Sequence, residues 1–128
     1  MHENVFKKYP NAHISGSIVW INMLPEDSLE AAIPSIKFLG DKRIQHFYDP
    51  NQRSGKEIAM SVGWNGHIAW DIYLFYPPTI EWTDIPPKPV SWMHQVSDEW
   101  AKNEHFHTGD DLKRELTVSL KMLLENLK

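Results

Sequence analysis

The sequence predicts an α/β fold, in which a small, largely parallel sheet lies between helices on both of its faces. Segments rich in β-branched and aromatic residues alternate with segments that carry helix-start and helix-end signals, and this alternation is typical of that class. The length of 128 residues and the apolar fraction of 41% suit one domain with one core. We therefore expect a single domain over residues 1–128.

The chain contains no cysteine. This excludes disulfides, thiolate nucleophiles, zinc–thiolate sites and every dithiol redox mechanism within it. The formal net charge is -4, and the basic residues are scattered along the chain. Because a duplex-binding surface normally has a basic stripe, we expect no nucleic-acid partner.

The apolar runs around residues 18–21 and 72–75 are far shorter than the roughly 20 residues needed to cross a bilayer. We therefore expect no membrane partner. The first residues lack the charged start, apolar stretch and cleavage site of a signal peptide. The cytoplasm is thus the default expectation for the location of this chain.

The chain opens with a predicted helix end and a predicted buried strand. Residues 3–9 have the character of the last turns of a helix, which Pro10 stops because proline cannot continue a helix. Residues 14–21 (ISGSIVWI) are β-branched and aromatic over their second half, which indicates a buried strand.

A helix should follow this strand. Pro25, with two acidic residues behind it, is a favourable helix start, and the helix should run to about Leu39. Pro34 lies within this segment and should kink the helix or split it in two.

A second strand, a second helix and a third strand complete the alternation. Residues 43–48 form the second predicted strand. Asp49, which a proline follows, repeats the helix-start signature and opens a helix that Gly63 closes. Residues 68–76 (IAWDIYLFY) carry large apolar groups on both faces, as expected of a strand covered by helices on each side.

The C-terminal third has a different composition. Residues 77–89 are rich in proline and predict an extended surface loop. Ser91 should cap a short helix whose apolar residues recur at helical spacing: Trp92, Val96 and Trp100. Thr108 or Asp110 should cap the last helix, whose leucines form a stripe at the same spacing: Leu112, Leu116, Leu120, Leu123 and Leu127.

Four segments are distinctive in combination: SIVWINML (residues 17–24), HFYDPNQRSGK (46–56), WDIYLFY (70–76) and WMHQV (92–96). In these segments the chain resembles a group of uncharacterised thioredoxin-like proteins. The resemblance covers nearly the whole chain. It implies a thioredoxin-like, three-layer α/β/α fold with a proline-rich loop and two C-terminal helices.

The resemblance also implies what this chain lacks. Thioredoxin-like enzymes open with a strand and a helix that carries Cys-x-x-Cys at its N-terminus, where the helix dipole lowers the thiol pKa. The first residues of this chain correspond to a position inside or just after that helix, which implies an N-terminally truncated domain. The family's cis-proline is also unmatched, because residues 66–68 (GHI) stand where it is expected. No catalytic residue therefore transfers from the family.

Asp71 is the leading candidate for a ligand-binding residue. It lies within an otherwise apolar strand, where a buried carboxylate must be paired, hydrogen-bonded or protonated. It can serve as an acid, a base or a ligand anchor. Trp70 and three histidines, His46, His67 and His94, complete this candidate site.

Asp71 and His94 also have simpler structural explanations, which we favour. Asp71 can cap a neighbouring backbone group or pair with an arginine such as Arg43. His94 can face water on the helix predicted from Ser91, while the tryptophans dock that helix on the core.

His105 and His107 are weak candidates for metal ligands, with Asp110 and Asp111 one turn away. A zinc site needs a third ligand, and nothing in the spacing says which residue supplies it. A polar loop between two helices is the simpler explanation, and we favour it. No metal site is therefore predicted.

The predicted function is binding. We expect no cofactor and no enzymatic activity, but a thioredoxin-like domain without redox cysteines. It would act as a binding or interaction module, or as the C-terminal part of a longer thiol–disulfide protein. The alternative is a metal- or ligand-binding protein, or a non-redox enzyme, that uses Asp71 and the nearby histidines. A missing strand would leave a sheet edge or an apolar face uncovered, which predicts a homo-oligomer formed through that surface.

Overall fold

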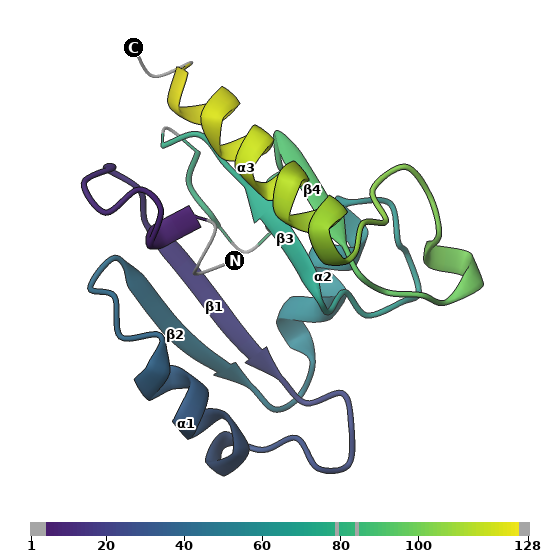
Figure 1. Cartoon of the computed structure of the whole chain (residues 1–128). Coiled ribbons are helices and arrows are strands. Elements are labelled where there is room, and N and C mark those ends of the chain that lie inside the picture. Colours follow the sequence, from purple (N-terminus) through teal and green to yellow (C-terminus); the bar gives the residue numbers. More distant parts are fainter. Residues whose placement is uncertain (1–4, 79, 84, 126–128) are drawn as a thin grey trace.

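The computed structural model describes residues 5–78, 80–83 and 85–125, and Figure 1 shows how its elements follow one another. The elements are β1 (Gly16–Ile21), α1 (Leu29–Phe38), β2 (Ile44–Asp49), α2 (Arg53–Ser61), β3 (Ile72–Phe75), β4 (Ser91–His94), the short 3₁₀ turn η2 (Glu99–Ala101) and α3 (Gly109–Glu125). This mixture of strands and helices confirms the α/β class.

The strands form two separate pairs. β1 and β2 run parallel, in a register that places Gly16 opposite Ile44 and Ile21 opposite Asp49. β3 and β4 run antiparallel. The proline-rich segment between β3 and β4 has no helix among its described residues, and a parallel crossover normally needs one. The expected parallel pairing is therefore confirmed for the first pair and wrong for the second.

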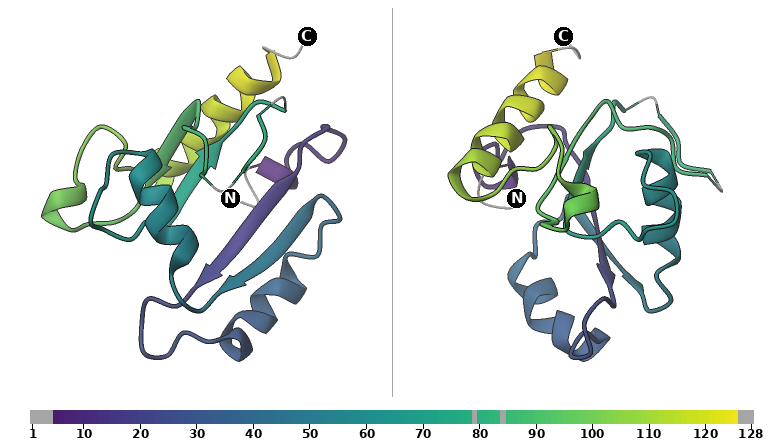
Figure 2. Two further views of the ribbon diagram at one scale, coloured as in Figure 1. Left: turned by 180° about the vertical axis from the view of Figure 1, so that it is seen from behind. Right: turned by 90° about the vertical axis from the view of Figure 1, so that its right-hand side faces the viewer.

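Helices cover both faces of the strands. In the right-hand view of Figure 2, α1 and α3 lie on one side of the strands and α2 lies on the other. The expected helical layers are therefore present in the described part of the chain. The expectation of two C-terminal helices is wrong, because the segment predicted as the first of them forms β4 and η2.

Helix α1 begins later than predicted because the chain first makes a turn. The Asp27 carboxylate accepts hydrogen bonds from the amides of Leu24 (2.8 Å) and Met23 (2.9 Å), which lower the pKa of Asp27. Ser28 then caps the helix through its side-chain oxygen. The helix is continuous across Pro34, so Pro34 does not split it in two, and the alternative of a kink stays a prediction. Proline removes one intrahelical hydrogen bond, and here its ring is exposed to solvent.

Asp49 bonds the first turn of α2, although the helix begins at Arg53, later than the predicted start at Asp49 and the proline after it. Its carboxylate accepts hydrogen bonds from the amides of Ser54 (2.8 Å) and Arg53 (3.1 Å). Partial burial opposes ionisation, but these bonds and one from the Ser54 hydroxyl lower the pKa of Asp49 below its ordinary value. Gly63, with a φ of 84°, ends the helix and confirms the predicted stop.

Strand β3 is shorter than the predicted strand over residues 68–76. Asp71 has a φ of 52°, and this left-handed conformation is incompatible with a continuous strand. The strand therefore begins at Ile72. Ala69 instead donates its amide to the carbonyl of Gly55 in α2 (2.9 Å).

The helix predicted from Ser91 is wrong, because Ser91–His94 forms β4. Met93 packs with the leucines of α3, whereas Trp92 packs with the residues beside α2. Successive side chains of a strand point to opposite faces, so a strand buries both sets at once. The helical spacing of Trp92 and Val96 is therefore coincidental.

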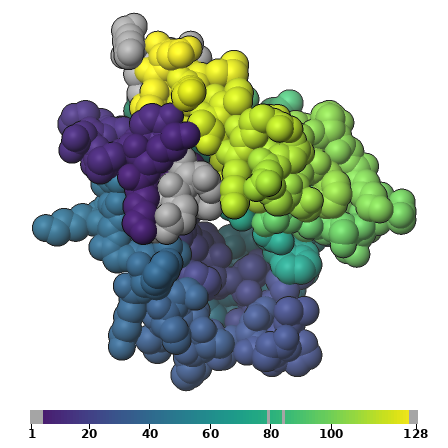
Figure 3. All heavy atoms as spheres, viewed as in Figure 1, coloured from purple at the N-terminus to yellow at the C-terminus, as the bar shows by residue number. Residues whose placement is uncertain are grey.

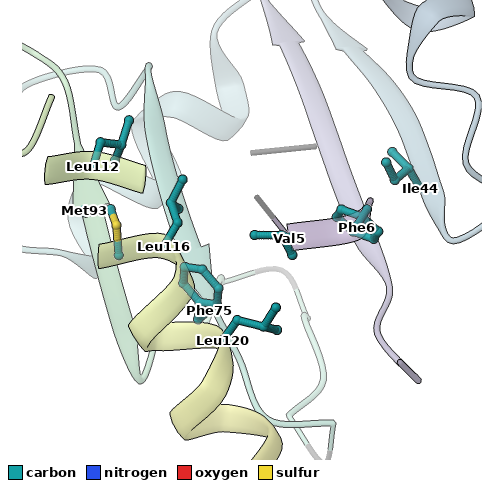
Figure 4. Close-up of a cluster of buried hydrophobic side chains, with 8 residues drawn as sticks. All are labelled: Val5, Phe6, Ile44, Phe75, Met93, Leu112, Leu116 and Leu120. Carbon is teal, nitrogen blue, oxygen red and sulfur yellow. The ribbon is translucent and has the colours of Figure 1, made fainter. Parts of the chain in front are cut away.

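The larger core cluster joins the two strand pairs. Val5 and Phe6 belong to a helical turn that the bond from the Tyr9 amide to the Val5 carbonyl closes (3.2 Å). Figure 4 shows these two side chains between β2 and the β3–α3 side of the molecule. They pack in one cluster with the following residues: Ile44, Phe75, Met93, Leu112, Leu116 and Leu120. Residues 3, 4 and 127 of the predicted helices lie outside the described residues.

Arg43 holds this N-terminal turn in place. Its guanidinium donates hydrogen bonds to the carbonyls of Phe6 (2.8 Å), Tyr9 (2.8 Å) and Ala12 (3.1 Å), and it pairs with Asp41 (2.8 Å).

Among the described strands, no ladder of hydrogen bonds joins β1 to β3. Figure 3 accordingly shows a hollow between the α1–β2 part of the surface and the part that contains α3. Side-chain packing therefore holds the two strand pairs together.

Candidate functional site

A cluster of indole and imidazole rings fixes β4 against the segment that follows α2. Trp64 is buried at its centre, with the ring centroids of His94, Trp100 and Trp92 at 4.7, 5.1 and 5.5 Å in edge-to-face geometry. Edge-to-face pairs are favoured by the aromatic quadrupole. We refer to these four residues as the Trp64 cluster. One of its members, Trp92, also lines the cavity described below.

His94 is completely buried in this cluster, so the expectation that it faces water is wrong. Its Nδ1 atom accepts a hydrogen bond from the amide of Val96 (3.1 Å). Its Nε2 atom has no hydrogen-bond partner among the described residues. Burial lowers the pKa of His94, and nearby polar groups of Asn103 and Ala101 offset only part of this effect. Burial thus favours the neutral imidazole.

The backbone of His94 anchors the segment that leads into α3. Its amide donates to the carbonyl of His105 (2.9 Å), and its carbonyl accepts from the amide of His107 (3.0 Å). Part of the outer edge of β4 is thereby covered. The remainder of that edge faces a cavity.

This cavity has a volume of about 650 Å³ and lies where β4, the end of α2 and the side of α3 meet. It is lined by backbone and side chains of these elements and of the adjoining loops: Ser61, Val62, Gly63, Lys88, Pro89, Val90, Ser91, Trp92, Met93, Glu104, His105, His107, Glu115 and Ser119. Its size is typical of a small-molecule site.

The polar groups of the cavity are ordered by their own contacts. The hydroxyls of Ser91 and Ser119 lie 2.7 Å apart, one donating to the other. His105 stacks on Trp92 with ring centroids 3.8 Å apart. Its Nδ1–H donates to the Trp92 carbonyl (2.9 Å), and its Nε2 lies 3.5 Å from a carboxylate oxygen of Glu104, which also lines the cavity. The cavity therefore offers hydroxyls and an oriented imidazole to a ligand.

A histidine and two carboxylates gather at one side of the cavity. One possible ligand atom from each of His107, Asp111 and Glu115 lies within 4.8 Å of the others. His107 Nδ1 lies 2.6 Å from Asp111 Oδ2, and Arg114 pairs with the other oxygen of Asp111. The hydrogen bond from His107, aided by Arg114, lowers the pKa of Asp111. Glu115 makes no hydrogen bond or ion pair with the part of the chain that the structure describes.

Asp71 does not occupy the environment predicted for it. Its side chain is exposed and accepts a hydrogen bond from Gln95 Nε2 (3.0 Å). The strand begins only after this residue, so the expected buried carboxylate is absent here. The expected pairing with Arg43 is also wrong, because Arg43 pairs with Asp41.

The other candidate ligand residues make contacts of their own elsewhere. His67 is exposed and stacks on Trp100, with ring centroids 3.7 Å apart. Trp70 is half-buried against the same core as the Trp64 cluster. His46 lies in β2, where its Nδ1 accepts from Trp20 Nε1 (3.1 Å) and its Nε2–H donates to the Leu39 carbonyl (3.2 Å). These contacts explain His46 as a structural residue.

Two parts of the observed site are not predicted from the sequence. Trp64 and its role at the centre of the cluster depend on contacts between distant segments. For Glu115, the sequence does contain a local pattern that could have identified it as a possible ligand. His107, Asp111 and Glu115 follow one another at intervals of four residues. Residues at this spacing lie on one face of a helix. Of the two histidines considered as metal ligands, only His107 joins this group, while His105 stacks on Trp92.

Comparison with protein-family models, with curated proteins and with solved structures finds no match to this chain. In the described part of the chain, no helix is both long enough and apolar enough to cross a membrane. We therefore base the functional conclusion on the geometry of the cavity and its surroundings.

Proposed function

We propose that this chain is a thioredoxin-like binding domain without thiol chemistry, and that it binds a small polar molecule in the cavity beside β4. The order of elements supports the first part. A parallel strand–helix–strand unit, β1–α1–β2, is followed through α2 by an antiparallel pair and a helix, β3–β4–α3. This order and the placement of helices on both faces suit a thioredoxin-like domain.

Setting this order of elements beside that of a thioredoxin-like enzyme suggests another position for the dithiol. Thioredoxin-like enzymes carry it at the N-terminus of the helix that follows the opening strand. If β1 is that strand, the equivalent segment is the loop before α1, where Met23, Leu24 and Pro25 stand. This segment contains no cysteine, and Asp71 stands immediately before β3. A thiol–disulfide function would need cysteines from outside this chain.

The cavity is the observation that carries the proposal. It combines an indole wall at Trp92 with paired hydroxyls at Ser91 and Ser119 and an oriented imidazole at His105. Sites for small molecules typically join an apolar wall to a few fixed polar groups. The alternative site built on Asp71 lacks this support, because Asp71 is exposed, His67 stacks on Trp100 and His46 is bonded to Trp20.

Ligand-observed NMR with a library of small polar fragments (amides, diols, carboxylates and amines) tests the proposal. Val90 lines the cavity and is 62% exposed, so Val90→Trp should block the cavity without disturbing the core. Val118→Trp makes the same change on α3 outside the cavity. We expect fragments that bind the unmodified chain and Val118→Trp but not Val90→Trp. Fragments that bind all three alike, or none that bind the unmodified chain, would overturn the proposal.

A further inference from the structure

We propose that His107, Asp111 and Glu115 form a binding site for a divalent transition-metal ion of the Zn²⁺ type at the side of the cavity. The site goes beyond the function proposed above, because it does not depend on the polar molecule. It rests on the placement of the three residues, on their chemistry and on the absence of a described partner for Glu115.

The three residues are positioned by different parts of the fold. The amide of His107 bonds to the carbonyl of His94 (3.0 Å), which ties His107 to the edge of β4 just before α3. Asp111 and Glu115 follow on the first two turns of α3, on the face that Cβ atoms four residues apart share. His107 and Glu115 both line the cavity. The backbone therefore presents all three side chains before any ion binds.

The donor set selects the class of ion. Imidazole nitrogen and carboxylate oxygen bind Zn²⁺ at about 2.0–2.2 Å, and Mg²⁺ prefers oxygen atoms alone. Two ligand atoms of a tetrahedral ion at this distance lie about 3.4 Å apart. The ligand atoms here already lie within 4.8 Å of one another, so small rotations of the side chains bring them into range.

An ion pair at the start of α3 is the simpler explanation, and it accounts for only part of the arrangement. The contact between His107 and Asp111 (2.6 Å) and the pairing of Asp111 with Arg114 are ordinary helix-surface interactions. Neither involves Glu115, which is half-buried beside this pair with no described partner. Partial burial makes a charge-neutralising partner favourable for a carboxylate, and a cation between Glu115, Asp111 and His107 supplies one.

The position of the site predicts how the ion would be used. Three protein ligands leave at least one coordination position open, as in zinc sites that bind water or a substrate. Because His107 and Glu115 line the cavity, the open position faces the space that Ser91 and Ser119 also line. The ion would therefore accept a donor atom from a molecule held in the cavity.

Isothermal titration calorimetry of the full chain with ZnCl₂ tests this site. Glu115→Gln removes a ligand that has no described partner to lose, so the fold should remain intact. Asp110→Asn removes the same charge from the same end of α3, but Asp110 lies outside the triad. We expect saturable binding of one ion, weakened about 10- to 100-fold or more by Glu115→Gln and by His107→Gln, and nearly unchanged by Asp110→Asn.

Three results would overturn the site: no saturable binding of Zn²⁺, equal weakening by Glu115→Gln and Asp110→Asn, or binding that His105→Gln abolishes and His107→Gln leaves unchanged. The second would show only a general charge effect, and the third would move the ion elsewhere. Circular dichroism of each variant confirms that it is folded. The fragment experiment is performed with EDTA present, so its outcome is independent of this one.

Discussion

The amide of Ala69 donates a hydrogen bond of 2.9 Å to the carbonyl of Gly55, which brings helix α2 into direct backbone contact with the segment before β3. A Cβ atom on Gly55 would lie 2.6 Å from Ile68 Cγ2, 2.7 Å from Ile21 Cδ1 and 2.9 Å from the Ala69 carbonyl oxygen. Gly55 thus lies where α2 meets both β1 and the chain leading to β3. Only a residue without a side chain allows this approach.

Gly55→Ala should therefore destabilise the protein, although alanine is the better helix former by about 1 kcal/mol. The clash involves backbone as well as side-chain atoms, and overpacking of this kind costs about 1–3 kcal/mol. Urea denaturation measures the change. Gly40→Ala is the control, because a Cβ there meets only the Lys37 carbonyl, at 3.4 Å. Equal stability of the two variants would contradict the role given to Gly55.

Asp49→Asn should reduce the free energy of unfolding by about 1 kcal/mol at pH 7, because it weakens the cap of α2. The folded-state pKa of Asp49 lies below its unfolded value. Ionised Asp49 therefore stabilises the fold above the unfolded pKa, and this contribution is lost as the pH falls through the lower folded pKa. The difference from the unmodified chain should shrink below about pH 4.

Denaturation curves from pH 7 to pH 3 follow this effect. Asp98→Asn serves as the comparison, because the Asp98 side chain makes no cap hydrogen bond. A difference between Asp49→Asn and the unmodified chain that stays constant over this range would show that the charge of Asp49 is not responsible.

Trp64→Ala should destabilise the protein by about 3–5 kcal/mol, the range for removing a large aromatic side chain from a core. It would also remove the ring against which Trp92, His94 and Trp100 pack. Trp82→Ala provides the contrast, since Trp82 is exposed and should cost little. Thermal unfolding of both variants, followed by far-UV circular dichroism, checks the difference. Equal losses of stability in the two variants would contradict the role of Trp64 at the centre of its cluster.

The expected homo-oligomer stays a prediction, and β2 is the strand through which we expect it to form. Its outer edge has no partner among the described strands, and Phe47 and Phe38 are exposed nearby in sequence. An uncovered edge of this kind favours pairing with a second copy. Size-exclusion chromatography with light scattering should show a dimer that Phe47→Lys weakens and Ile85→Lys, in the proline-rich segment, does not. A clean monomer at high concentration would refute it.

The sequence predicts the elements that carry their own local signals. Asp49 bonds the first turn of α2, Gly63 lies just beyond its end, and the leucine stripe identifies α3, because caps and helical spacing act within a few residues. Strand β4 is mistaken for a helix because strand pairing depends on distant residues, and Trp92 and Val96 fit a helical period by coincidence.

The candidate site is predicted less well than the fold. His107 and Asp111 are identified as possible ligands, but Glu115 is not, and Asp71 is given a burial that its backbone conformation prevents. The cavity depends on how β4, α2 and α3 meet, which no local pattern encodes. Binding sites assembled from several elements emerge only once the packing is known.

The joint between the two strand pairs also governs how the molecule opens. Among the described strands, no ladder hydrogen bond joins β1–β2 to β3–β4, so separating the two pairs breaks side-chain packing, including that of Val5 and Phe6 in their cluster. Amide protons within each ladder would then exchange with deuterium as two independent groups, each with its own opening free energy. A force that pulls the two strand pairs apart would therefore be resisted by side-chain packing, to which Phe6 contributes, and not by ladder hydrogen bonds.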